Sequence, residues 1–271
     1  PFRKNSAVKN DRQDAEAIAT AARQGNMRFI SVKTEDQQAR LSWHRVCEGY
    51  KKDALAVMNR IRGLLSEFGI VIGQSAIALR RALADLEAMQ LPPEFVQLVR
   101  LQQRYWEAIA ACQEACDVRI KEHAEQDERC ERIRGLTGVG PLTADAIVAT
   151  LGNASDFKNG RQCAAWMGLT PSQFGTGGKV QLGKISCRGD SYLRTLLIQG
   201  ARSSLQRAKL TPADKATAEQ LWIVQLASRL PFGKVLVAIA NKHARQMWAM
   251  LARNEAYDAE AWLKHPMVQR G

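Results

Sequence analysis

The chain has 271 residues, of which 46% are hydrophobic, so it can bury the core of one large domain or two ordinary ones. Its Lys and Arg outnumber its Asp and Glu by 39 to 27, and the resulting net charge of +12 favours a nucleic-acid partner over an acidic small molecule. A membrane surface is the competing explanation for the charge, although no apolar run approaches the roughly 18 residues that span a bilayer.

Cysteine usage favours a reducing cytoplasm. The six cysteines are scattered without a CxxC pair, and no N-terminal signal peptide is visible. Cys112 and Cys116 are one helical turn apart and could form half a metal site, but such cysteines are more often small buried hydrophobes. The chain starts at Pro1 in polar sequence, so we expect a fragment that lacks its N-terminal portion.

The first part of the chain predicts long helices. Helical signals cover residues 11–24, 35–72, 76–89 and 94–134, and residues 27–34 predict a brief extended segment. In the last helix Leu98, Tyr105 and Cys112 recur every seven residues, as do Ile109 and Cys116, which is typical of a weak coiled-coil seam. This seam has two interpretations. It could serve as a dimerisation surface or a rigid arm, or it could pack within one chain as a helical hairpin with the preceding helix.

The second part predicts shorter helices, and a domain boundary is expected near Arg132. The helices cover residues 141–151, 160–167, 190–208, 212–228 and 231–253, with Asp190 as an N-cap and one strand at 179–185. The chain as present is therefore expected to be mostly α.

Two carboxylates open the first predicted helix. Asp11 and Asp14 are three residues apart and share a helix face, and Mg²⁺ is commonly held by one or two carboxylates together with phosphates. The alternative is that both residues cap the helix and favour its dipole.

The segment LTGVGP at residues 136–141 resembles the loop of a helix-hairpin-helix element. Gly138 and Gly140 would expose backbone amides to a phosphate at a helix N-terminus, and Pro141 suits the first helical turn. Such an element holds a DNA backbone without reading bases. An ordinary tight turn between two helices is the alternative.

A glycine-rich, basic run covers residues 168–202. Glycines let backbone amides approach an anion closely, and basic side chains add charge. We expect six residues of the run to contact phosphates: Gly177, Gly178, Lys179, Lys184, Arg188 and Arg194. Thr176 carries a hydroxyl that can attack phosphorus when a metal or base lowers the barrier. The alternative is a flexible surface loop before a helix.

Four segments occur in an order that resembles a known family: KNDRQDAEAIA, LTGVGPLTADAI, the run from GRQCAAWMGLT to LLIQGAR, and NKHARQMWAML. The chain resembles the IS110/IS1111 group of insertion-sequence transposases, DEDD transposases related to the Piv invertase. The resemblance covers nearly the whole chain and is specific in its C-terminal half.

The resemblance implies three parts. Residues 1–34 would be the C-terminal remnant of an α/β RuvC-like (RNase H fold) catalytic domain, residues 35–132 a coiled-coil arm, and residues 133–271 an α-helical transposase domain with the helix-hairpin-helix element. It implies a DNA recombinase that uses a guide RNA to choose its DNA and that works as a homodimer or homotetramer.

The resemblance also implies a chemistry. Four acidic residues of the RuvC-like domain would bind Mg²⁺; Asp11 and Asp14 match the last two, and the first two would lie on the expected missing portion. The family nucleophile is a serine in a turn before Gly-Gly-Lys, and Thr176 stands at that position here. Because threonine is β-branched, attack from a tight turn is more hindered.

Two other functions remain open. One is a catalytically inactive fragment that binds nucleic acid and oligomerises. The other is a Holliday-junction processing factor, which would explain the charge and the GVG loop but not the run from Gly175 to Arg194.

Overall fold

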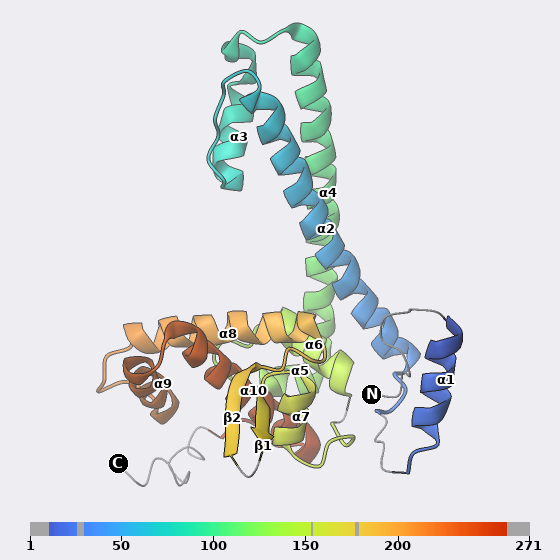
Figure 1. The fold of residues 1–271 in the computed structure, drawn as a ribbon. Helices are drawn as coiled ribbons and strands as arrows, with labels where there is room; N and C mark the ends of the chain where they lie inside the picture. The colour runs from blue at the N-terminus through green and yellow to red at the C-terminus, as the bar shows by residue number, and fades with distance from the viewer. Residues whose placement is uncertain (1–10, 26–29, 153, 177–178, 259–271) are drawn as a thin grey trace. The chain divides into compact units, whose positions relative to one another are not determined.

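The computed structural model describes residues 11–25, 30–152, 154–176 and 179–258 (Figure 1). The chain divides into two compact units, Pro1–Val32 and Lys33–Gly271. In the first unit α1 (Asp11–Ala22) confirms the first predicted helix. The predicted extended segment lies partly outside the described residues, and residues 30–34 form no strand.

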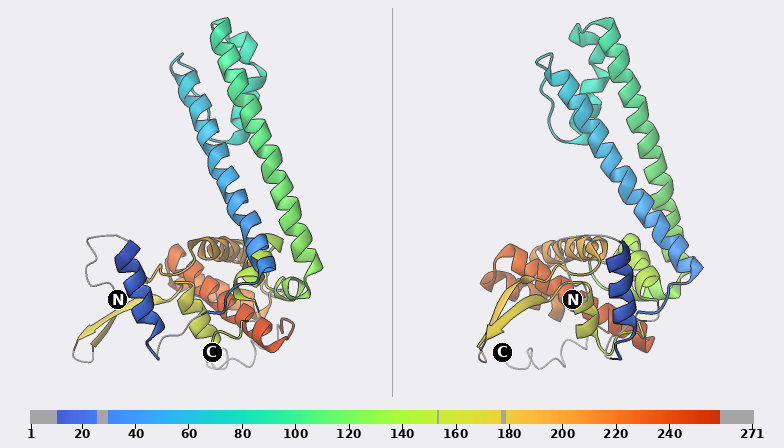
Figure 2. Two further views of the ribbon diagram at one scale, coloured as in Figure 1. Left: turned by 90° about the vertical axis from the view of Figure 1, so that its right-hand side faces the viewer. Right: turned by 45° about the vertical axis from the view of Figure 1, so that its right-hand side comes forward.

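The second unit begins with a helical arm made of α2 (Glu35–Ser66) and α4 (Pro93–Gln126), which lie side by side in both views of Figure 2. Between them α3 (Ala76–Ala84) and η1 (Leu86–Met89) fold back along the far end of the arm. Apolar residues of all four elements form one core cluster, which includes Ile61, Leu79, Leu86 and Trp106. The arm is therefore stabilised by burial within one chain.

The predicted helix 35–72 is too long, because α2 ends in a Schellman motif. Gly69 has a φ of 76°, its N–H donates to the carbonyl of Ser66, and the N–H of Ile70 donates to the carbonyl of Leu65. A glycine in the left-handed region closes the helix at low steric cost. The apolar residues beyond it pack against the arm from a loop.

The predicted seven-residue seam is divided between two faces of α4. Trp106, Ile109 and Cys116 are buried within the second unit, whereas Leu98 and Tyr105 are 42% and 51% exposed. A hairpin within one chain is confirmed, but α4 forms it with α2 and not with the helix just before it, and Leu98, Tyr105 and Cys112 lie outside its core.

The predicted helix 94–134 is interrupted at Asp127. This residue adopts extended backbone angles, and its side chain accepts a hydrogen bond from the backbone N–H of Arg129, which starts α5 (Glu128–Ile133). A capping carboxylate competes with the helical backbone in this way. The break turns the chain from the arm into the helical body.

The body surrounds α6 (Pro141–Leu151), whose residues from Thr143 onward are all buried. Around it lie α7 (Gly160–Trp166), α8 (Ser191–Leu210), α9 (Ala218–Arg229) and α10 (Phe232–Arg253). The predicted 212–228 helix starts late because Thr217 and Gln220 form a capping box.

Two antiparallel strands leave the body as a β-hairpin, β1 (Pro171–Thr176) and β2 (Lys179–Ile185). The strand at 179–185 was predicted, but its partner β1 was missed. The mostly-α prediction is confirmed; that residues 1–34 derive from a RuvC-like domain stays a prediction. Within the described part of the chain, no helix is both long and apolar enough to span a membrane.

Candidate functional site

The loop between α5 and α6 packs tightly on α8. Gly138 has a φ of 86°, and a Cβ built on it would lie 2.2 Å from the carbonyl oxygen of Gly200. Ser204 of α8 donates a hydrogen bond of 2.6 Å from its hydroxyl to the carbonyl of Thr137. Gly138 is therefore required by packing and by its backbone conformation, whatever else the loop binds.

Gly140, the other glycine of this motif, has a different environment. It is the exposed N-cap of α6, with a φ of −86°, and nothing lies within 4 Å of a Cβ built on it. α6 has no side-chain cap at this end; Pro141 has no N–H to offer, and the next backbone N–H groups belong to Leu142 and Thr143, of which Thr143 is buried. Of the two predicted glycines, only Gly140 has the open surroundings that phosphate contact needs.

One carboxylate is buried inside the apolar helix α6. Asp145 is fully buried; Oδ1 accepts hydrogen bonds from the Arg40 guanidinium, including one of 2.9 Å from Nε, and Oδ2 lies 2.8 Å from His44 Nε2. Burial alone would raise the pKa of the Asp145 carboxyl, but the hydrogen bonds from His44 and Arg40 outweigh it and hold the pKa below its usual value. Asp145 is therefore an ionised buried group that joins α2 to α6.

The network continues from Arg40 to the end of the arm. Arg40 Nη1 donates a hydrogen bond of 2.7 Å to Asp127, whose carboxylate also accepts from the Arg129 guanidinium at 2.7 Å. Burial raises the pKa of the Asp127 carboxyl, but these two partners lower it more, and the net pKa is well below the usual value. Arg40 thus links α2, α4–α5 and α6 through two carboxylates.

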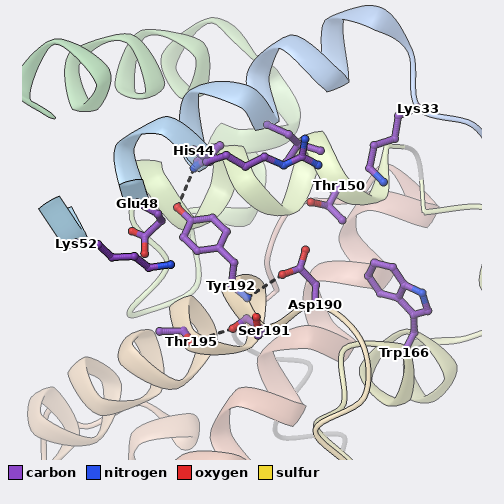
Figure 3. A pocket seen from close by; sticks show the side chains of 12 residues that line it. Lys33, His44, Glu48, Lys52, Thr150, Trp166, Asp190, Ser191, Tyr192 and Thr195 are labelled. Carbon is purple, nitrogen blue, oxygen red and sulfur yellow. Dashed lines mark hydrogen bonds between the residues drawn. The ribbon is translucent and has the colours of Figure 1, made fainter. Parts of the chain in front are cut away.

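The network also reaches a pocket through Tyr192 (Figure 3). His44 Nδ1 lies 2.9 Å from the Tyr192 hydroxyl. In the tautomer that carries its proton on Nε2, facing the Asp145 carboxylate, Nδ1 accepts the hydrogen bond from the Tyr192 O–H. Burial raises the pKa of the Tyr192 hydroxyl, which keeps its proton at neutral pH. The hydrogen bonds between Asp145 and His44 and between His44 and Tyr192 hold the tyrosine ring in a defined orientation.

The pocket itself has a volume of about 480 Å³ and lies between α2, α6, α7 and the start of α8. The side chains that line it differ in character. Apart from His44 and Tyr192, they comprise three cations, two carboxylates, three hydroxyls, an indole and one leucine. In chain order, the residues other than His44 and Tyr192 are Lys33, Leu41, Arg45, Glu48, Lys52, Thr150, Trp166, Asp190, Ser191 and Thr195.

The base of the β-hairpin is fixed by two close glycine contacts. A Cβ on Gly168 would lie 2.1 Å from the carbonyl oxygen of Arg188, and one on Gly189 would lie 1.9 Å from that of Trp166; both glycines have positive φ. Thr176 pairs with Lys179 at the opposite end of the ladder. Gly177 and Gly178 lie outside the described residues.

The predicted basic contacts have different environments. Lys184 and Arg188 are exposed, as phosphate contact requires, whereas Arg194 is half-buried and donates a hydrogen bond of 3.2 Å to the carbonyl of Met167. The backbone of Lys179 lies at the tip of the ladder. Arg194 therefore has a structural contact that the sequence did not indicate.

Comparison with known proteins gives the family. The family model "Transposase IS116/IS110/IS902 family" matches residues 130–218. A "Probable family 20 transposase" of Pseudomonas aeruginosa is 41% identical over 253 residues, which are 92% of this chain and 74% of the relative. This chain belongs to the IS116/IS110/IS902 transposase family.

Two further relatives agree with that assignment. The "Transposase for insertion sequence element IS1111A" of Coxiella burnetii is 37% identical and shares 92% of this chain and 68% of its own length. The "Transposase for insertion sequence element IS1328" of Yersinia enterocolitica is 34% identical, and the match covers 95% of this chain and 75% of that relative. The similarity thus extends over arm and body alike.

The acidic pair predicted to bind metal lies in the first turn of α1. Asp11 is exposed and Asp14 half-buried, three residues apart. In the described part of this family member no three His, Cys, Asp or Glu side chains are grouped to hold a metal. Two carboxylates on one helical turn fit a partial Mg²⁺ site, because the ion commonly keeps several waters and phosphate ligands.

Sequence reasoning missed the buried network of the transposase chain. The four histidines form no cluster along the sequence, so their spacing does not indicate that His44 contacts Asp145, 101 positions away. One signal was available: Asp145 is the single charged residue within the apolar run 141–151. A charge in such a run is rarely buried without a partner.

Proposed function

We propose that this transposase-family chain cuts and rejoins DNA of an insertion sequence through a covalent protein–DNA intermediate. The Thr176 hydroxyl attacks the phosphorus of a phosphodiester, a P–O bond to Thr176 forms, and the bond to the leaving deoxyribose oxygen breaks. The hydroxyl proton is lost to a base and the leaving oxygen gains one, so the step needs no oxidant or reductant.

One observation carries the proposal. Thr176 and Lys179 flank the Gly-Gly pair at the far end of a β-hairpin whose base is held by tight glycine contacts, in a chain of a transposase family. The backbone ladder ends with this pair, so the turn that carries the proposed nucleophile lies at the end of the hairpin away from its base. Lys184, Arg188 and the open helix start at Gly140 add further phosphate contacts to the proposal.

Magnesium and a guide RNA complete the proposed reaction. Asp11 and Asp14 would hold Mg²⁺, and the chemistry that such an ion would supply is stabilisation of negative charge on the oxygens of the phosphodiester. The net charge of +12 supports binding of both nucleic acids through their backbones. In the proposal, the loop at residues 136–141 contacts the DNA backbone without reading its bases. A guide RNA would then select the DNA sequence by base pairing.

The chemistry is tested by trapping the adduct. The protein, produced with any residues that its gene encodes before Pro1, is incubated with Mg²⁺, guide RNA and labelled substrate DNA, and adducts are resolved by denaturing electrophoresis. Thr176→Ala should reduce adduct formation by at least about a thousandfold, because the attacking oxygen is gone. Thr176→Ser should retain it, since a primary hydroxyl is less hindered.

Ser172 provides the matched control, because its hydroxyl lies on the same strand but donates to the carbonyl of Lys184 at 3.0 Å. Ser172→Ala should leave the adduct yield within about threefold of the wild type. An adduct that persists in Thr176→Ala would transfer the nucleophile to another residue.

Self-association through α4 is the proposed basis of the oligomer. Leu98, Leu101, Tyr105 and Cys112 are exposed on α4 at successive spacings of three, four and seven residues, and Leu101 is 53% exposed. This spacing suits a helix of a second copy packed against the same face. None of these four side chains belongs to the core cluster of the arm, although Cys112 lies within hydrogen-bond range of Tyr50 on α2.

Leu101→Glu should raise the dissociation constant of the oligomer by about tenfold or more, because a charge would enter the seam. Leu55→Glu is the matched control, since Leu55 is 54% exposed on α2 and lies off the stripe. Light scattering after gel filtration measures both. Equal masses for the two variants at every concentration would remove the stripe from the interface.

A further inference from the structure

We propose that the pocket beside Tyr192 receives one unpaired nucleotide of a nucleic-acid strand. The inference rests on the proposed function in requiring a nucleic-acid partner, and it adds a site to which no role has been given above. The pocket of about 480 Å³ lies within the range of small-molecule sites and holds a single base with its sugar, not a duplex.

A buried hydroxyl in the pocket lacks a partner. Thr150 is 6% exposed, lines the pocket, and its Oγ1 has no hydrogen-bond partner among the described residues. Buried polar atoms are nearly always paired, so this oxygen has an unmet hydrogen bond, which a ligand in the pocket would satisfy once the Thr150 side chain rotates about χ1 toward it. As both donor and acceptor, a hydroxyl suits the edge of a nucleobase.

Aromatic rings supply the stacking surfaces. Trp166 lines the pocket at the end of α7, and its ring is held by contact with Phe157 at a centroid distance of 5.5 Å. Tyr192 stands across the pocket in the view of Figure 3 and is oriented by its bond to His44. Unpaired bases are commonly stacked on such side chains, which bind them with little sequence preference.

The charges distinguish a nucleotide from a simple anion. Lys33, Arg45 and Lys52 can contact the phosphates on either side of the base. Asp190 Oδ1 accepts hydrogen bonds from backbone N–H groups of α8, so Oδ2 is the oxygen that can accept one from an amino group of the base. Glu48 forms an ion pair with Lys51 at 2.9 Å, so it neutralises less of the positive charge of the pocket than an unpaired carboxylate would. A site for free phosphate would have no need of a carboxylate or an indole.

The test compares three short DNA duplexes: fully paired, with one extrahelical 2-aminopurine, and with an abasic nucleotide at the same bulge. The protein should bind the extrahelical base on the order of tenfold more tightly than the abasic bulge, and the fluorescence of 2-aminopurine should fall as the base stacks. An RNA duplex set of the same design shows whether the nucleotide comes from DNA or RNA.

Thr150→Val should reduce this preference several-fold while leaving the melting temperature unchanged or higher, because it removes an unpaired hydroxyl at constant volume. Trp166→Ala should abolish the preference. Thr143→Val, on the same helix but outside the pocket, should retain it.

Equal binding of the bulged and abasic duplexes in both nucleic acids, or full preference in Thr150→Val and Trp166→Ala, would overturn the pocket assignment and leave the proposed function intact. Failure to bind any of the duplexes would instead remove the proposed function, and the pocket with it.

Discussion

Asp145→Asn should lower the free energy of unfolding by about 3 kcal/mol or more, the largest loss expected from a single isosteric change in this chain. The amide keeps the volume of the carboxylate but removes its charge from beside the buried guanidinium of Arg40, and it turns an NH₂ group toward one of two donors, Arg40 or His44. Urea denaturation followed by circular dichroism at neutral pH measures the loss.

The same variant carries a pH signature. Because folding lowers the pKa of the Asp145 carboxyl, its contribution is complete above the unfolded value of about 3.9 and is lost as pH falls through the lower folded pKa. The gap between wild type and variant should therefore stay constant from about pH 7 to about pH 5 and shrink as the pH falls below about 4. Asp214→Asn, at an exposed position of the same unit, should change stability by less than about 0.5 kcal/mol. A constant gap at all pH values would mean that Asp145 is not ionised.

Gly138→Ala should destabilise the body by about 2–5 kcal/mol, combining the strain of a positive φ with overpacking against α8. The added Cβ would lie 2.2 Å from the carbonyl oxygen of Gly200 and 2.6 Å from Ser204 Oγ, and the carbonyl belongs to a helix backbone that cannot move alone. Thermal melting of the purified variant measures this effect.

Gly140→Ala is its control from the same motif, two residues away. Its Cβ would enter open space at an ordinary φ of −86°, so stability should stay within about 1 kcal/mol of the wild type. Similar losses in both variants would show that the loop is not held against α8 as described.

Local sequence signals predicted the body well. α6 spans residues 141–151 as expected, because Gly140 and Pro141 start it and Gly152 ends it. Asp190 caps α8 as predicted and accepts hydrogen bonds from the backbone N–H groups of Tyr192 and Leu193. Such caps and breakers act within a few residues and can be read from the chain alone.

Other boundaries depended on contacts that are remote in sequence. Asp127 interrupts a helix that its neighbours would continue, and its carboxylate is held there by Arg40, 87 positions away. The missed strand β1 exists through pairing with β2, and its glycine and glutamine are poor strand formers on their own. Local propensity is weak in both places, so the tertiary partner decides.

The sequence by itself determined the mostly helical fold, the family, the positive net charge and the pair Thr176–Lys179 around two glycines, because these depend on composition and short motifs. Only the tertiary structure decided which glycine of the GVG loop packs and which is open, which face of α4 is free, and that Arg40, His44, Asp145 and Tyr192 meet. The physical reason is burial: a charge or a close backbone contact in the core is defined by its neighbours in space, and those neighbours come from distant parts of the chain.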